Sequence, residues 1–130
     1  MNSYLKTQTI TTTLEPPTGD KFQLAAILPL VKPTRESTND IPITLHLSKV
    51  GADTPLGCYV YSIYDNKNKE VYQTLLNNGE ETLVDLTKKI GLLVSKKYGI
   101  PTYVSMSGSW SLEDLISTVK LIVDFIDESY

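Results

Sequence analysis

Residues 80–130 constrain the fold of this chain more than any other stretch, because they read as a helix, a short strand and a second helix. From 80 to 98, apolar side chains recur at steps of three and four, which places them on one stripe of a helix. These are Leu83, Leu86, Ile90, Leu93 and Val94. Gly99 and Pro101 then end the helix, because glycine tolerates the left-handed backbone of a helix end and proline cannot continue a helix.

A second apolar stripe begins after Ser111, where a second helix is predicted to open. Its members share one broad helical face and are Leu112, Leu115, Ile116, Val119, Ile122, Val123 and Ile126. The β-branched residues of 102–106, between the two helices, predict a short strand. Two helices that each bury one face need a sheet between or beneath them.

Five earlier segments have the composition or the alternation of strands, and they are 4–14, 22–28, 41–48, 56–64 and 71–76. The polar face of the first predicts an edge strand, and the nearly continuous apolar run of the second predicts burial on both faces. Short turns join the five, which favours an antiparallel meander. We therefore predict an α+β fold in which residues 1–130 form one domain. It should have a single, mostly antiparallel sheet of about six strands and two helices packed on one face.

The strand predicted at 56–64 separates its side chains most clearly into two kinds. Tyr59, Tyr61 and Ile63 face one way, and the smaller Cys58, Val60 and Ser62 face the other way. Small side chains leave room for a helix to approach. Tyrosines bring a large apolar area with a polar tip, which suits an interface better than a sealed core.

Composition and charge exclude several classes of protein. The chain has 130 residues, of which 41% are hydrophobic and 21% charged, as in ordinary globular domains. Its net charge of -3 argues against nucleic acid as a partner, and no apolar run approaches the roughly 20 residues of a membrane span. Cys58 is the single cysteine, so no internal disulfide can form. We expect a cytoplasmic protein, with the nucleus as a second location.

The sequence has few residues that suggest catalysis. His46 is the single histidine and alternates outward from an apolar strand face. Nucleophilic catalysis requires a second group beside it, so we interpret His46 as a surface or interface residue and Cys58 as a small buried hydrophobe. The loop 107–109 precedes a helix and its amides could hold a phosphate, but no glycine-rich fingerprint supports this. We predict no catalytic, cofactor-binding or metal-binding residue.

Leu121 and Phe125 lie away from the core stripe of the second helix, and as an i, i+4 pair they touch each other. Packing against the first helix is the favoured interpretation. The alternative is contact with a partner protein.

Four stretches together resemble a known family. They are Ile-Pro-Ile at 41–43, Leu-Gly-Cys-Tyr-Val-Tyr at 56–61, Lys-Tyr-Gly-Ile-Pro-Thr-Tyr-Val-Ser at 97–105, and the closing helix at 112–128. In their order and spacing they resemble the fungal form of proteasome assembly chaperone four.

The resemblance implies a non-enzymatic chaperone that pairs with a sister, proteasome assembly chaperone three. The heterodimer would bind the α-type proteasome subunit α5 and promote assembly of the α-ring. On this basis we expect Tyr59, Tyr61 and Ile63 to form the sister interface, and Leu121 and Phe125 to be a possible client contact. Two alternatives remain open, a small ligand- or phosphate-binding domain of enzyme type that uses the loop 107–109, and a generic profilin-like adaptor.

Overall fold

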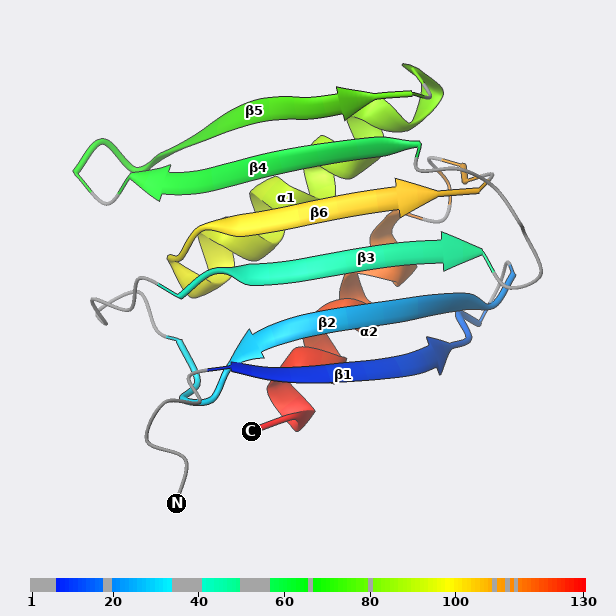
Figure 1. Cartoon of the computed structure of the whole chain (residues 1–130), viewed down its shortest axis with the longest axis horizontal. Coiled ribbons are helices and arrows are strands. Elements are labelled where there is room, and N and C mark those ends of the chain that lie inside the picture. The colour runs from blue at the N-terminus through cyan, green and yellow to red at the C-terminus, as the bar shows by residue number, and fades with distance from the viewer. Residues whose placement is uncertain are drawn as a thin grey trace.

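The computed structural model of the protein describes residues 7–17, 20–33, 41–49, 57–65, 67–79, 81–108, 110, 111, 113 and 115–130. These residues form one six-stranded sheet and two α-helices (Figure 1), which confirms the predicted α+β class. In chain order the elements are β1 (Thr7–Leu14), β2 (Phe22–Pro29), β3 (Ile43–Lys49), β4 (Cys58–Asp65), β5 (Glu70–Asn78), a 3₁₀ turn (Glu81–Leu83), α1 (Val84–Tyr98), β6 (Thr102–Ser107) and α2 (Leu115–Glu128). None of the helices in these ranges is long and apolar enough to cross a membrane.

The strands lie in the order β1-β2-β3-β6-β4-β5. The predicted meander is wrong at one point, because β6 lies between β3 and β4 and pairs in parallel with β3. All other neighbouring strands are antiparallel. The sequence pattern could not place β6, since α1 carries the chain behind the sheet before β6 returns to it (Figure 1). The parallel pair of β3 and β6 is therefore the centre of the sheet.

Both helices cover the same face of the sheet, as predicted (Figure 1). On β2 the residues that face the helices are buried, namely Phe22, Leu24, Ala26 and Leu28. The other side of β2 is not buried, since Gln23 is exposed and Ile27 is 39% exposed. The prediction that this strand is buried on both faces is therefore wrong for the isolated chain, because no helix covers its second face.

The C-terminal end of α1 follows from the sequence, but its start at Val84, later than the predicted residue 80, and part of its buried stripe do not. Gly99 ends the helix with a left-handed backbone, at φ 69°, and its N–H donates to the carbonyl of Ser95 at 2.8 Å. Leu86, Ile90 and Val94 are buried as predicted, whereas Leu93 is 41% exposed. α2 begins at Leu115, later than expected, and Leu112 lies outside the described residues.

Gly91 allows α1 to approach β4 very closely. A Cβ atom at this position would lie 2.5 Å from the hydroxyl oxygen of Ser62, nearer than any real carbon contact. The amide of Gln73 on β5 joins the two layers beside this point. Its Nε2 donates to Ser62 Oγ at 2.8 Å and to the Lys88 carbonyl at 2.7 Å.

The carboxylate of Asp127 ties the end of α2 to two other parts of the fold. The Tyr98 hydroxyl at the end of α1 donates to it at 2.8 Å, and Lys32 Nζ after β2 lies 3.2 Å away. Burial would raise the pKa of Asp127, but these hydrogen bonds and the nearby lysines outweigh it and hold that pKa below its ordinary value. Burial and the same carboxylate raise the pKa of Tyr98.

Candidate functional site: the helix-free face of the sheet

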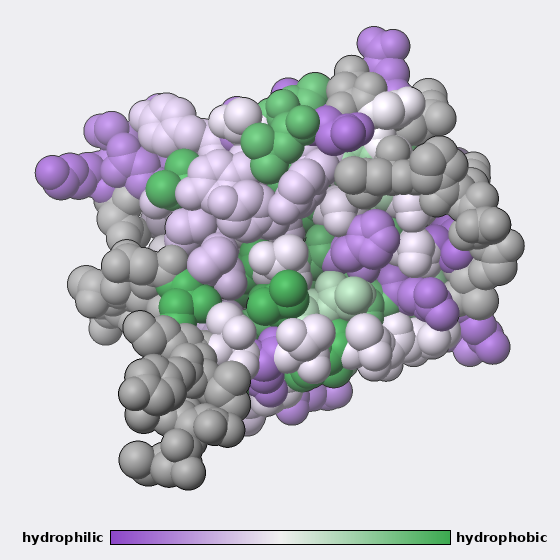
Figure 2. Space-filling model, viewed as in Figure 1, coloured by the Kyte–Doolittle hydropathy of each residue, from purple (hydrophilic) through white to green (hydrophobic). Residues whose placement is uncertain are grey.

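The face of the sheet opposite the helices has no other element of the described chain over it (Figure 1), and we call it the open face. Because side chains alternate along a strand, it carries every second residue of each strand. Figure 2 views this face and shows green apolar groups separated by pale and purple polar ones. The open face therefore consists of distinct patches with different chemistry.

An aromatic patch occupies the open face on β4 and β6, and we call it the tyrosine cluster. It consists of Tyr59, Tyr61 and Tyr103. The ring of Tyr103 lies 4.6 Å from that of Tyr61 and 5.9 Å from that of Tyr59, between centroids, which is the range of favourable aromatic pairs. Burial, and next the neighbouring Tyr103, raise the pKa of both Tyr59 and Tyr61, so both stay neutral hydroxyl groups.

The tyrosine cluster continues toward the β4–β5 hairpin. Ile63 pairs with Tyr72 across the two strands, and these side chains are 40% and 50% exposed. The open face thus carries the three residues that the sequence assigned to a sister interface. Tyr59 and Tyr61 are half-buried, Ile63 is exposed, and Cys58, Val60 and Ser62 are buried under the helices as predicted.

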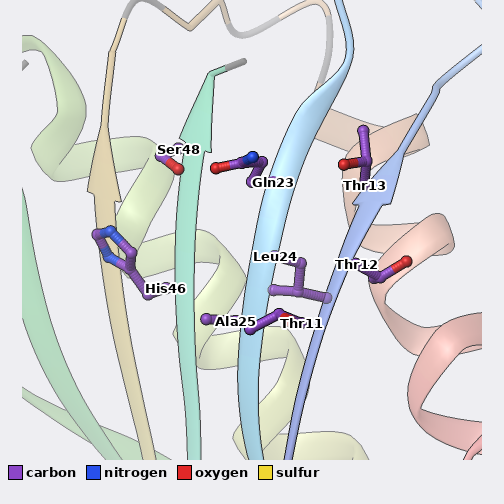
Figure 3. Close-up of a pocket in the computed structure, with 8 residues that line it drawn as sticks. All are labelled: Thr11, Thr12, Thr13, Gln23, Leu24, Ala25, His46 and Ser48. Carbon is purple, nitrogen blue, oxygen red and sulfur yellow. The ribbon is translucent and has the colours of Figure 1, made fainter. Parts of the chain in front are cut away.

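A polar hollow lies on the open face over β1, β2 and β3, with a volume of about 280 Å³ (Figure 3). Its open-face lining consists of the side chains of Thr11, Thr13, Gln23, Ala25, His46 and Ser48. None of these side chains carries a formal charge when His46 is neutral. The hollow therefore offers hydroxyl, amide and imidazole groups to an uncharged occupant rather than to an ion.

His46 connects the polar hollow to the tyrosine cluster. Its Nδ1 shares a hydrogen bond of 2.6 Å with Ser105 Oγ on β6, and Tyr59 pairs with Ser105 across the next strand boundary. Burial lowers the pKa of His46, which favours the neutral ring near pH 7. The histidine and serine are close enough for proton exchange, but the serine is itself nearly buried and its oxygen also lies 3.5 Å from the Leu45 carbonyl. We therefore interpret the His46–Ser105 hydrogen bond as a structural contact between β3 and β6 rather than as a catalytic pair.

The other candidate residues lie on α2 and at the end of β6. Leu121 and Phe125 are half-buried and pack against the core. Ile116 is 83% exposed, so its assignment to the buried apolar stripe of the second helix is wrong. Ser107 is buried and its carbonyl accepts the indole N–H of Trp110, whereas Ser109 lies outside the described residues.

The described ranges contain no group of three or more histidine, cysteine or carboxylate side chains that could hold a metal ion. Cys58 is buried on the helical side of β4, and the His46 ring lies on the open face, so the two do not meet. Sequence reasoning missed Tyr103 and the polar hollow. Alternation alone puts Tyr103 on a face with Ser105, but only the insertion of β6 beside β4 brings it to Tyr59 and Tyr61.

The fold and this face define the class as an open-faced α+β domain, in which two helices bury one side of a mixed sheet and aromatic and polar side chains occupy the other. Residues 6–127 match the model of one protein family, described as 20S proteasome chaperone assembly proteins 3 and 4. The chain belongs to this family of proteasome assembly chaperones.

A solved structure has the same fold, and it is described as the crystal structure of a novel chaperone complex for yeast 20S proteasome assembly. Its TM-score to this chain is 0.79 at 21% sequence identity, and the match covers 95% of this chain and 98% of that one. No curated protein matches the chain.

Proposed function

We propose that this protein is a non-enzymatic assembly chaperone that pairs with a sister of the same family, assembly chaperone three. The pair would bind the α-type proteasome subunit α5 and promote assembly of the α-ring. One observation supports the pairing most directly. A whole face of the sheet, with Tyr59, Tyr61 and Ile63 on it, is left without cover by the chain's own helices.

The chemistry of this face supports a protein partner rather than a small substrate. The tyrosine cluster offers large rigid aromatic area with polar tips, the composition that protein interfaces favour. A sister with the same fold would bring a similar uncovered sheet. Two such sheets can close on each other at the usual spacing of a β-sandwich, about 10 Å.

The pairing is tested with Tyr61→Ala and Tyr61→Lys, each co-expressed with the sister chain and analysed by size exclusion. Truncation of a central aromatic should cost on the order of 2 kcal/mol of binding or more, and lysine should cost more because its charge would be buried without a partner. Circular dichroism should show an unchanged fold, since the side chain lies on the open face. Unchanged pairing of both variants would mean that the sister binds elsewhere.

For the client contact we propose Leu121 and Phe125, the half-buried i, i+4 pair of α2. Phe125→Asp should then weaken binding of the α5 subunit while sister pairing persists. Ile116→Asp is the matched control, because Ile116 lies on the same helix and is already 83% exposed. If Phe125→Asp unfolds the protein, Leu121 and Phe125 act as core residues and the client binds at another surface.

The absence of catalysis is part of the proposal and has its own test. Hydrolase or transferase activity that disappears in His46→Ala or Cys58→Ala would contradict it. The alternative of a phosphate-binding loop at 107–109 has little support, because the Ser107 side chain is buried and its carbonyl is engaged by Trp110.

A further inference from the structure

The two patches of the open face lie symmetrically about the centre of the sheet. The strand order places three strands on each side of the boundary between β3 and β6. The polar hollow lies over β1, β2 and β3, and Tyr59 and Tyr61 lie on β4. The hollow and the tyrosine cluster are thus on opposite sides of one line that runs along the strands.

The strand registers place the polar hollow and the tyrosine cluster at the same position along the strand direction. Ala25 on β2 pairs with His46 on β3, His46 pairs with Ser105 on β6, and Ser105 pairs with Tyr59 on β4. Thr11 and Asn77 extend the same row to the two edge strands. Ala25, the smallest side chain in the lining of the hollow, lies as far from the centre as Tyr59 does on the other side.

The hollow suits a tyrosine side chain in volume and in chemistry. At about 30 Å³ of liquid per water molecule, its volume of about 280 Å³ corresponds to roughly nine waters and accommodates one phenol ring. Gln23, His46 and the hydroxyl groups around them can donate to and accept from a phenol oxygen. A phosphate, carboxylate or ammonium group would find no opposite charge in this lining.

From this complementarity we infer that, in the absence of its sister, the open face closes on a second copy of this chain, with Tyr59 of each copy in the polar hollow of the other. A two-fold axis parallel to the strands, over the boundary of β3 and β6, brings this about. It puts β4 of each copy over β2 of the other, and β5 of each copy over β1 of the other. Each contact therefore occurs twice, as in isologous dimers. The inference rests on the proposed function, in that both assign association to the open face.

The area of the face is sufficient for such a dimer. Six strands of about seven residues present roughly 600 Å² at ordinary strand spacing and rise. Two copies would bury about 1,200 Å², the lower end of the range for specific interfaces. A dimer of this size can exchange, so the sister chain can displace the second copy from the same face.

The dimer is tested by sedimentation of the full chain, purified without its sister, over a range of concentrations. We expect a concentration-dependent dimer. Ala25→Phe, which fills the hollow, should weaken the dimer by about tenfold or more, as loss of a central contact does. Thr7→Phe is the matched control, because Thr7 lies exposed on the same face but outside the hollow, and it should change the dimer by no more than about threefold. A monomer at every concentration, or an Ala25→Phe dimer as strong as the parent, would overturn the inference.

The direction of the axis is tested by crosslinking. Thr11→Cys and Asn77→Cys copies are mixed and treated with a short bismaleimide, while the buried Cys58 is the remaining thiol. The proposed axis brings β1 over β5, so crosslinks should join position 11 to position 77. An axis across the strands brings β1 over β1, and a predominance of crosslinks between two copies of position 11 would refute the arrangement.

The two proposals fail separately. If the sister pairs with the parent chain but not with Tyr61→Lys, while the chain alone is a monomer, the second-copy dimer is wrong and the proposed function stands. If the sister pairs equally well with Tyr61→Lys, the proposed function is wrong in its choice of interface.

Discussion

Replacement of Gly91 by alanine tests how the helical layer is seated on the sheet. In an isolated helix this change is favourable by about 1 kcal/mol, because glycine is a poor helix former. In this fold the added Cβ would lie 2.5 Å from Ser62 Oγ, which is the oxygen that accepts the hydrogen bond from Gln73. The outcome depends on which of the two effects is larger.

The structure indicates that the steric effect is larger. Inserting a methyl group into a packed core costs about 1–3 kcal/mol, and disturbing the Gln73 hydrogen bond costs about 1 kcal/mol more. We therefore expect Gly91→Ala to lower the free energy of unfolding by about 1–3 kcal/mol after the helix gain of about 1 kcal/mol is included. Lys89→Ala, on the exposed side of α1, is the control and should change it by less than about 0.5 kcal/mol.

In a Ser62→Ala background, Gly91→Ala should raise the free energy of unfolding instead of lowering it. Without the hydroxyl, the nearest neighbours of the new Cβ are the β-carbon at position 62 and Gln73 Nε2, both at 3.5 Å, which is ordinary contact. Gln73 keeps its second acceptor, the Lys88 carbonyl. In urea titrations of the four proteins of this double-mutant cycle, we expect a coupling energy of about 2 kcal/mol or more between the two positions. Equal destabilisation by Gly91→Ala in both backgrounds would refute the close-approach argument.

Two further predictions concern titratable groups. Tyr98→Phe removes a hydrogen bond to the Asp127 carboxylate, so it should lower the free energy of unfolding by about 1 kcal/mol. It should also raise the pKa of Asp127, measured by NMR titration. An unchanged pKa would show that this hydrogen bond does not lower the pKa of Asp127. Because the pKa of Asp127 is lower in the folded state, the stability that it contributes is present above its unfolded pKa and is lost as pH falls through the folded one. Burial also lowers the pKa of His46, because it disfavours the charged ring. The unfolded chain therefore takes up this proton more readily than the folded protein. The free energy of unfolding should fall as pH drops below the unfolded pKa of 6.5, and it should continue to fall down to the folded pKa. His46→Gln should remove that part of the pH dependence of denaturation, and an unchanged profile between parent and variant would show that another group is responsible.

Part of the candidate site could be predicted from the sequence because it depends on a single strand. The period of two along β4 separates Tyr59, Tyr61 and Ile63 from Cys58, Val60 and Ser62 wherever the strand lies in the sheet. The polar hollow could not be predicted from the sequence, because its lining comes from three strands and depends on the register in which they pair. His46 alternates outward in the sequence as it does in the fold, but nothing local shows that Ser105 is its neighbour.

The sequence by itself determined the six strands, the two helices and their order, since these follow from local periodicity, from glycine and proline at element ends, and from the apolar stripes. The small side chains on one face of β4 also indicated which face of that strand α1 approaches. Only the tertiary structure decided that β6 enters between β3 and β4. Strand pairing joins segments far apart in the chain, and many positions in the strand order are compatible with the same alternation of polar and apolar residues. That insertion brings Tyr103 to Tyr59 and Tyr61 and places the polar hollow opposite them across the centre of the sheet.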